Sequence, residues 1–553
     1  MKIFILALFT SFILLSCVYS QVHQDWVQRF NGPGNADDYA TSMVVDGSGN
    51  VYITGASYAA GTGTNYATVK YNSSGVQQWV SIYNGTGNDD DVAYAITIDG
   101  SGNVYVTGSS RGTYEDFATI KYNSSGIQVW AQRYNGPGNS QDIARSIAVD
   151  ASGNVYVTGF SIGSGTGTDV ATIKYNSSGA QQWVQRYNNS SNNFDAGYCL
   201  VLDGSVNIYV TGTSSLDGTN FDCLTVKYNS SGIQQWVQRY NGTANGWDYG
   251  SAVTVDVSGN VYVTGNSAVN GTNHDILTIK YNPAGTQQWV QTYNGTGNST
   301  DEAFAVAADG SGNVYVAGWS ASSAINLDYA SIKYNTSGAQ QWVQRYDGPS
   351  NSNDQATSIA IDGTGNVYVT GYSYNAALIS DYVTIKYNSS GVQQWLQRYD
   401  GPGNGEDRAS SIAVDASGNV YVTGRSLGSG PGNDFCTIKY SQQIGIKKIS
   451  SEVPADYSLL QNYPNPFNPT TTIEFDIPLS PLSERGAGGL VTLKIYDLLG
   501  REIETLVNEE LKAGSYSVSF NGDKLSSGIY YYKLSATSGA NYYSYTKKLV
   551  LSK

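Results

Sequence analysis

The chain has 553 residues, including 63 glycines and 45 tyrosines, and only 13% of its residues are charged. Its formal net charge of −14 makes nucleic acid and an anionic membrane surface poor partners, so we exclude both classes. Glycine-rich and aromatic-rich sequence with this little charge is typical of an all-β protein, and the length allows several packed sheets and a second small domain.

The first twenty residues have the features of an export signal. Lys2 supplies a positive start, Ile3–Leu15 an apolar stretch, and Val18–Ser20 a small-residue cleavage site. Because the apolar stretch is short and polar sequence follows directly, it does not fit a transmembrane helix. We therefore expect residues 1–20 to be a signal peptide that is removed on export. Leu14–Cys17 partly resembles a lipoprotein signal, so lipidation of Cys17 is the alternative.

Residues 26–440 repeat one unit of about 53 residues eight times. Each copy opens with a tryptophan, at Trp26, Trp79, Trp130, Trp183, Trp236, Trp289, Trp342 and Trp395. Every copy contains four short runs rich in Val, Ile, Thr and Tyr, bounded by Gly, Asn and Pro, and none has the apolar period of a helix. Four antiparallel strands per unit at a fixed period predict the blades of a β-propeller, which we assign to residues 21–440.

The two ends of this array are complementary. It begins with the tryptophan strand Trp26–Phe30 and ends with the run Thr437–Tyr440, so the last copy lacks a tryptophan strand of its own. We predict that these two segments pair, which closes a ring of eight blades and removes an exposed strand edge. A ring of seven blades with one displaced copy is the alternative.

The motif Asp-x-Ser-Gly-Asn-Val-Tyr-Val-Thr-Gly recurs, for example at Asp150–Gly159, Asp256–Gly265 and Asp415–Gly424. It resembles the SBBP type of β-propeller repeat over the whole of residues 26–440. The resemblance implies the propeller fold but no particular activity, because propellers host many functions. The family name implies seven blades, and the eight copies counted here depart from it.

The composition changes after a polar stretch, residues 441–452, which we expect to be a linker. Tyr457–Pro469 reads YSLLQNYPNPFNP, and short alternating runs such as Thr471–Ile477 follow. Residues 453–553 therefore predict a small Ig-like β-sandwich. They also resemble the type A C-terminal sorting domain of the type IX secretion system. That resemblance implies passage across the outer membrane of a Bacteroidetes-type bacterium by the type IX machinery, to a secreted or cell-surface location.

Few residues suit catalysis. His23 and His274 are too few for a zinc site, and a Ser-His-Asp triad would rest on one loop histidine. Glutamate is scarce in the repeats, at Glu115, Glu302 and Glu406, and forms no evident pair for glycoside hydrolysis. We therefore expect a non-catalytic protein without a cofactor or metal, and we keep a carbohydrate-active enzyme as an alternative.

Three cysteines remain after the signal peptide, at Cys199, Cys223 and Cys436. An odd number cannot form a disulfide framework. Cys199 and Cys223 belong to the second and fourth strand runs of one copy, which an intervening strand separates beyond disulfide reach. We expect buried free thiols.

Aspartate recurs at fixed positions in the copies. One series precedes the Thr-Ile-Lys-Tyr run, at Asp116, Asp169, Asp222, Asp275, Asp328, Asp381 and Asp434, with Asn65 in the first copy. A residue present in nearly every copy is more economically structural, since aspartate in turns accepts backbone N–H bonds. Calcium at the Asp-x-Ser-Gly-Asn turns is the alternative.

The loop after Val-Tyr-Val-Thr-Gly varies freely between copies, whereas the Asp-Gly-Ser-Gly-Asn and Asn-Ser-Ser-Gly loops barely change. Because the chain alternates up and down in each blade, the variable loops should share one rim with the Asn-Gly-Pro-Gly-Asn connections. The recurring tryptophans are better explained by packing between blades than by sugar stacking. The aromatic and arginine residues of the variable rim are the candidate binding residues: Arg111, Phe160, Trp247, Trp319, Tyr372, Tyr374 and Arg425.

These observations favour a monomeric, secreted or cell-surface propeller that binds an extracellular glycan or protein through its variable rim. A purely structural or adhesion component is the second hypothesis.

Overall fold

A computed structural model of the chain describes residues 22–218, 220–269, 273–323, 326–442, 447–450, 452–479, 489–522, 525–538 and 541–553. These residues form strands and turns without a helix, which confirms the all-β prediction. Two compact units are present, one over residues 24–441 and one that contains residues 442–553. The predicted signal peptide, including Cys17, and residues 480–488 lie outside the described residues. The described chain offers no helix of the length and apolarity that a membrane crossing requires.

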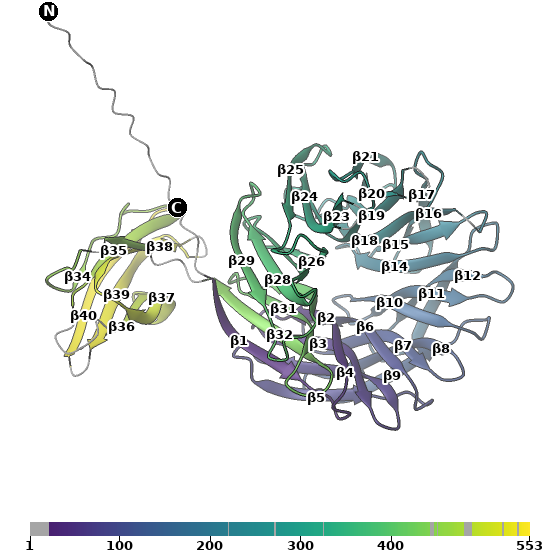
Figure 1. Ribbon diagram of the computed structural model, residues 1–553, viewed down its shortest axis with the longest axis horizontal. Coiled ribbons are helices and arrows are strands. Elements are labelled where there is room, and N and C mark those ends of the chain that lie inside the picture. The colour runs from purple at the N-terminus through teal and green to yellow at the C-terminus, as the bar shows by residue number, and fades with distance from the viewer. Residues whose placement is uncertain are drawn as a thin grey trace, which may run out of the picture. The chain divides into compact units, whose positions relative to one another are not determined.

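The larger unit contains eight four-stranded antiparallel sheets, numbered here in chain order (Figure 1). The strands of sheets 1 to 4 are β2 (Asp38–Val45), β3 (Val51–Ala59), β4 (Gly63–Tyr71) and β5 (Gln77–Tyr83); β6 (Asp91–Ile98), β7 (Val104–Arg111), β8 (Glu115–Tyr122) and β9 (Gln128–Tyr134); β10 (Asp142–Val149), β11 (Val155–Ile162), β12 (Thr168–Tyr175) and β13 (Gln181–Tyr187); and β14 (Asp195–Leu202), β15 (Ile208–Ser215), β16 (Phe221–Tyr228) and β17 (Gln234–Tyr240).

The strands of sheets 5 to 8 are β18 (Asp248–Val255), β19 (Val261–Ala268), β20 (His274–Tyr281) and β21 (Gln287–Tyr293); β22 (Asp301–Ala308), β23 (Val314–Ser323), β24 (Asn326–Tyr334) and β25 (Gln340–Tyr346); β26 (Asp354–Ile361), β27 (Val367–Tyr374), β28 (Ser380–Tyr387) and β29 (Gln393–Tyr399); and β30 (Asp407–Val414), β31 (Val420–Leu427), β32 (Asn433–Gln442) and β1 (Val22–Phe30).

The sheets follow one another around a ring. The first strand of every sheet contacts the first strand of both neighbouring sheets, and β2 of sheet 1 contacts β30 of sheet 8. These innermost strands gather in the middle of the unit (Figure 1). Strand β1, from the beginning of the chain, is hydrogen-bonded to β32 and completes sheet 8. This arrangement confirms the predicted pairing of Trp26–Phe30 with the last run of the array.

The recurring tryptophans pack between neighbouring sheets. Trp130 on the outer strand of sheet 2 donates from Nε1 to the carbonyl oxygen of Ser177 in sheet 3, at 3.3 Å, and Lys121 Nζ donates to the same oxygen at 3.2 Å. The indole covers Gly179, whose φ of 87° and closeness to the ring exclude a side chain. Its ring centroid lies 6.1 Å from that of Tyr175. Six further tryptophans make the equivalent bond, and Trp395 is buried against Tyr440 without it, so the series packs between sheets as predicted.

The Asp-x-Ser-Gly-Asn turns are held by their own aspartates. Asp150 Oδ1 accepts the backbone N–H groups of Ser152 and Asn154, at 2.8 and 2.9 Å. Its Oδ2 accepts the Asn154 amide at 2.8 Å and the Tyr156 hydroxyl at 3.1 Å. Burial opposes ionisation, but these donors outweigh it and lower the pKa of Asp150 below its usual value. Both oxygens of the carboxylate are thus occupied by donors of its own turn, which gives Asp150 a structural role there.

The three cysteines are free thiols, as the sequence predicts. Cys199 on β14 and Cys223 on β16 are separated by β15, which pairs with both strands. Burial raises the pKa of Cys436 to about 12, so this thiol is not reactive at neutral pH.

The smaller unit contains two four-stranded sheets whose buried side chains form one apolar cluster. The strands, in sheet order, are β33 (Lys447–Ser450), β38 (Gly514–Asn521), β35 (Thr470–Ile477) and β34 (Ser458–Leu459), then β37 (Glu502–Leu511), β36 (Gly489–Tyr496), β39 (Gly528–Ser538) and β40 (Asn541–Leu551). The segment expected as a linker, residues 441–452, differs from that expectation. Its second half contains β33, because the backbone of Lys447–Ser450 adds an edge strand to β38.

Candidate ligand-binding face

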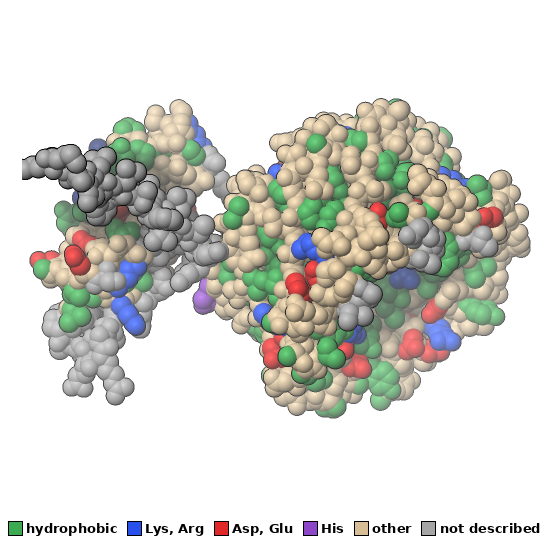
Figure 2. Space-filling view, turned by 45° about the horizontal axis from the view of Figure 1, so that its top comes forward, with side chains coloured by type: hydrophobic (Ala, Val, Ile, Leu, Met, Phe, Trp, Pro, Cys, Tyr) green, Lys and Arg blue, Asp and Glu red, His purple; other side chains and the backbone are tan. Residues whose placement is uncertain are grey.

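The two kinds of loop lie on opposite rims of the propeller unit. Gly138, in the connection before β10, donates its N–H to the carbonyl of Ile162, where the variable loop begins, at 3.0 Å. On the opposite rim, Gly153 of the Asp-x-Ser-Gly-Asn turn lies beside Ser177 of the Asn-Ser-Ser-Gly turn. The predicted grouping of loops is confirmed, and we call the rim with the variable loops the variable face. Charged side chains are sparse on the side of this unit seen in Figure 2.

The predicted binding residues lie in different environments. Arg111 is exposed, and Trp247 is 48% exposed. The half-buried ones are Phe160, Tyr372, Tyr374 and Arg425. All of these belong to strands or connections at the variable face.

Trp319 corrects the expectation that this whole set is exposed, because its side chain is only 9% exposed. It does not lie in a loop: strand β23 continues to Ser323, so Trp319 pairs with Glu302 on one side and Tyr329 on the other. Its indole is therefore a packing group in the sheet, and we remove it from the candidate site.

Three of the predicted residues, Tyr372, Tyr374 and Arg425, form one cluster. They are connected by Arg408 and Glu406, which the sequence analysis did not assign to the site. The Arg408 guanidinium lies over the Tyr372 ring at 4.8 Å and donates to the Tyr374 hydroxyl at 2.9 Å. Glu406 pairs with Arg408 at 3.0 Å and with Arg425 at 3.4 Å. Glu406 is thus shared by two arginines, which leaves the cluster with one net positive charge.

Each innermost strand contains a β-bulge at the same place. The pairing register shifts after the third residue of the strand, for example between Ala144 and Ser146 in β10, so one residue is left over. A bulge redirects its extra side chain, and bulges are frequent beside functional sites. The bulge residues around the ring are Thr41, Tyr94, Arg145, Tyr198, Ser251, Phe304, Thr357 and Ser410.

Hydroxyl bulge residues bridge neighbouring sheets. Thr41 Oγ1 donates to the carbonyl of Ala93 in sheet 2 at 2.9 Å. Ser410 Oγ donates to Ala40 of sheet 1 at 2.8 Å, and Thr357 makes the equivalent bond to sheet 8. The large bulge residues of sheets 2, 3, 4 and 6 replace this bridge with aromatic rings and one guanidinium. The bulge position therefore carries a small hydroxyl residue in sheets 1, 5, 7 and 8 and a large residue in sheets 2, 3, 4 and 6.

Arg145 is the cation among these large bulge residues. Its guanidinium lies 4.6 Å from the Tyr94 ring centroid and 5.7 Å from that of Phe160. Among the described residues it has no ion pair, and its Nε is buried without a hydrogen-bond partner. Burial raises the pKa of the neighbouring Tyr198, against the opposing effect of the Arg145 charge. The N–H donors of a guanidinium that stacks on a ring lie in the guanidinium's own plane and point away from the ring. A carboxylate, phosphate or sugar oxygen can therefore accept them.

A series of aromatic rings leads away from Phe160 along the variable face. Phe160 contacts Phe194 at 6.4 Å between centroids, and Phe194 contacts Phe221 at 5.7 Å. Phe221 in turn contacts Trp247 at 5.7 Å and stacks on Tyr249 at 6.1 Å. These rings connect sheets 3, 4 and 5 and end at the exposed Trp247. Together with Arg145 they form the candidate site.

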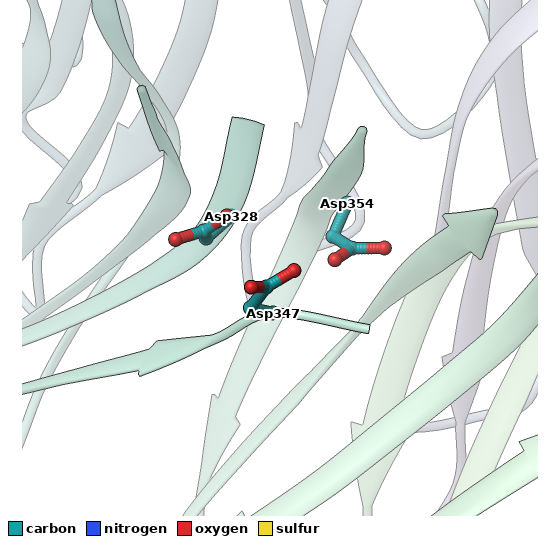
Figure 3. A group of neighbouring side chains, drawn as sticks. All are labelled: Asp328, Asp347 and Asp354. Carbon is teal, nitrogen blue, oxygen red and sulfur yellow. The ribbon is translucent and has the colours of Figure 1, made fainter. Parts of the chain in front are cut away.

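Acidic side chains meet elsewhere on this rim. Asp328, Asp347 and Asp354 each offer a carboxylate oxygen within 4.8 Å of the others (Figure 3), and Asp381, Asp400 and Asp407 repeat the arrangement in the next sheet. Arg345 already pairs with Asp328 at 2.8 Å. Burial, reinforced by repulsion from Asp347, raises the pKa of Asp354 to about 6. Each of the three side chains offers one ligand atom, and Arg345 already occupies Asp328, so the group falls short of the six to eight oxygens usual for calcium.

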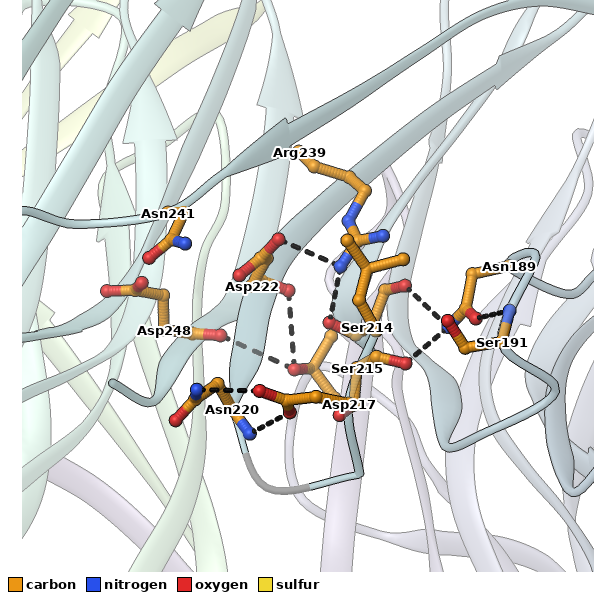
Figure 4. Close-up of polar contacts among 12 residues, drawn as sticks. Asn189, Ser191, Ser214, Ser215, Asp217, Asn220, Asp222, Arg239, Asn241 and Asp248 are labelled. Atoms are coloured by element: carbon orange, nitrogen blue, oxygen red, sulfur yellow. Dashed lines mark hydrogen bonds and ion pairs between the residues drawn. The ribbon is translucent and has the colours of Figure 1, made fainter. Parts of the chain in front are cut away.

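The aspartates before the Thr-Ile-Lys-Tyr runs pair with arginines of the outer strands. In sheet 4, Arg239 pairs with Asp222 at 2.8 Å and donates to the Ser214 carbonyl at 3.1 Å (Figure 4). The six pairs are Arg29–Asp434, Arg133–Asp116, Arg186–Asp169, Arg239–Asp222, Arg345–Asp328 and Arg398–Asp381. This aspartate series is therefore structural in six of the eight sheets.

Comparison with family models identifies both parts of the chain. The SBBP model, described as a beta-propeller repeat, matches residues 25–61, 78–115, 129–165, 288–324, 341–377 and 398–431. The model of the secretion system C-terminal sorting domain matches residues 461–552.

Similarity to individual proteins is more distant. The regulatory protein FlaEY of Caulobacter vibrioides is 26% identical over 273 residues, which cover 45% of this chain and 28% of that protein. This chain thus spans little more than a quarter of its curated relative. PorZ of Porphyromonas gingivalis, a surface component of the type IX secretion system, has a TM-score of 0.36 at 13% identity over 94% of this chain and 74% of PorZ. The β-propeller domain of the Trilobed protease from Pyrococcus furiosus has a TM-score of 0.35 at 8% identity, over 66% of this chain and 96% of that domain.

Proposed function

We propose that this SBBP-repeat protein, which carries a type IX sorting domain and is exported to the cell surface or beyond, is a non-catalytic binding protein. Its variable face would capture an extracellular glycan or protein, and its sorting domain would engage the type IX machinery. A signal peptide over residues 1–20 would start export. Each four-stranded sheet would be one blade, which gives eight blades in residues 21–440, and residues 453–553 would form an Ig-like sandwich.

The observation that carries the proposal is the broken symmetry of the bulge residues. A structural ring has no need for different side chains at equivalent positions, and sheets 1, 7 and 8 use the bulge hydroxyl to bridge neighbours. Sheet 3 instead presents Arg145, whose guanidinium lies near the Tyr94 and Phe160 rings and whose Nε has no hydrogen-bond partner among the described residues. Aromatic and arginine side chains are the commonest energetic anchors of binding sites. The arrangement suits a ligand with oxygen acceptors and an apolar face.

The test is binding of the full mature chain to a glycan array and to immobilised extracellular proteins. Arg145→Ser installs the residue that sheets 5 and 8 carry at the bulge, and should weaken capture about tenfold or more. Arg501→Ser removes an exposed arginine of the smaller unit that pairs with Asp497 at 2.6 Å, and should change capture little. Equal affinities of the Arg145→Ser variant and the unaltered chain would reject this site. Absence of any ligand would favour a structural or adhesion role, and turnover of a polysaccharide would indicate an enzyme.

A further inference from the structure

In six sheets the arginine of the arginine–aspartate pair puts its guanidinium at the same position, which we call the guanidinium place. In sheet 3, Arg186 reaches from the outer strand to Asp169 Oδ2 at 2.7 Å. The same guanidinium donates to Ser161 Oγ at 2.6 Å and to the Tyr134 hydroxyl of sheet 2 at 3.1 Å. Carboxylate, serine and tyrosine oxygens therefore surround a planar cation, which suits the fixed fork of an arginine.

Sheet 5 has the acceptors of this place without the arginine. The outer strand carries the exposed Thr292 at the arginine position, while Asp275 and Ser267 occupy the acceptor positions. Asp275 is only 7% exposed and has no ion pair or hydrogen bond with another described residue. Tyr240 of sheet 4 and Ser267 occupy the positions of Tyr134 and Ser161, and the two side chains are hydrogen-bonded to each other.

Sheet 1 shows how the same loss is tolerated elsewhere. Its outer strand has Ile82 at the arginine position, and Asn65 replaces the aspartate. The amide of Asn65 donates to Thr62 Oγ1 at 2.9 Å, so no buried charge is left. Sheet 5, by contrast, has Thr292 in place of the arginine but keeps the aspartate, Asp275. Burial and the charge of Asp301 raise the pKa of Asp275 to about 6, so at neutral pH an uncompensated carboxylate is held inside the protein.

We propose that sheet 5 binds the guanidinium group of an arginine side chain from a partner protein, in the place that the chain's own arginine fills in six other sheets. Asp275 would pair with the guanidinium, and Ser267 and Tyr240 would accept its remaining N–H donors. Thr292, at the outer edge of the place, is exposed, so a partner side chain would enter there. The acidic net charge of −14 favours a cationic partner. This site has the opposite charge and uses neither Arg145 nor the aromatic rings of the candidate site.

The test uses the full mature chain at pH 7.5, where Asp275 is ionised. Nα-acetyl-arginine amide is titrated at constant ionic strength, and Nα-acetyl-citrulline amide, a neutral analogue of the same shape, is the control. We expect the arginine compound in tenfold excess over its Kd to raise the melting temperature by about 1–2 °C, and the citrulline compound to have no effect. The response should disappear in Asp275→Asn and in Thr292→Arg. The second variant should also melt higher than the unaltered chain, because it restores the internal pair.

A gain-of-function variant separates this proposal from general stabilisation. Arg186→Thr opens the equivalent place in sheet 3 and should respond more strongly to the arginine compound than the unaltered chain does. An equal response to both compounds, or an unchanged response in Asp275→Asn and Thr292→Arg, would overturn the proposal. Stabilisation by calcium chloride but not by the arginine compound would also overturn it, since it would indicate a metal site.

Discussion

Replacing Arg239 by threonine should destabilise the propeller unit in a strongly pH-dependent way. The substitution reproduces in sheet 4 what sheet 5 has naturally, and it leaves Asp222 without its cation (Figure 4). Burial already raises the pKa of Asp222, and Arg239 counteracts that effect. Without the arginine, the pKa of Asp222 should approach the value of about 6 that Asp275 shows in the same position.

The magnitude follows from that comparison. A rise from the ordinary value of 3.8 to about 6 corresponds to about 3 kcal/mol at a pH above both values. This figure is an upper limit, because burial already holds the pKa of Asp222 above 3.8 in the unaltered chain. We expect a loss of about 1–2 kcal/mol, or a fall of about 1–2 °C in melting temperature for a unit of this size. A carboxyl with a raised pKa costs stability only when ionised. The loss should therefore be complete above pH 7 and should vanish as the pH falls towards 4.

Thermal unfolding of the unaltered chain and of the variant at pH 4.5, 6.0 and 7.5 measures this effect. In the double variant Arg239→Thr with Asp222→Asn, the additional pH dependence introduced by Arg239→Thr should be absent, since position 222 no longer carries a carboxyl. An equal loss at pH 4.5 and 7.5, or no loss at either, would refute the reasoning.

Three further predictions concern the ring, the tryptophans and the sorting domain. Deleting Val22–Phe30 should lower the melting temperature by several degrees or cause aggregation, because β32 loses its partner; unchanged melting and solubility would contradict ring closure. Trp342→Ala should cost about 3 kcal/mol. Trp247→Ala, at a half-exposed position, should cost less than about 0.5 kcal/mol yet weaken capture, and equal shifts in denaturant midpoint would contradict this distinction. Removing Val453–Lys553 should leave the propeller unit folded but retained in the cell envelope; normal amounts outside the cell would contradict this.

The fold was predictable because turn and strand signals repeat in register. Each Asp-x-Ser-Gly-Asn turn is closed by its own aspartate, a local interaction that the sequence shows directly. The pairing of β1 with β32 was predictable from the two ends of the array. The array begins with a single tryptophan strand, and its last copy lacks that strand.

The candidate site was only partly predictable. Arg145 lies in a run of alternating residues, and nothing in that run indicates that one residue is extra; the bulge appears only in the pairing with β11. Trp319 seemed to begin a loop because it follows a Thr-Gly-like pair, whereas strand β23 continues beyond it. The Asp275 place could have been found by comparing copies, since Thr292 replaces arginine there without a matching loss of aspartate.

Completion of sheet 8 depends on both ends of the propeller sequence. Arg29 on β1 contacts Asp434 on β32, 405 residues later in the chain. At synthesis rates of about 5–20 residues per second, β1 must wait about 20–80 seconds before its partner exists. In the other seven sheets the strand equivalent to β32 pairs with the outer strand that follows it in the chain, so only sheet 8 depends on a strand made at the start. Ring closure therefore requires synthesis through the last repeat. In a chain that ends before Tyr440, strand β1 should stay unpaired and be open to proteolysis.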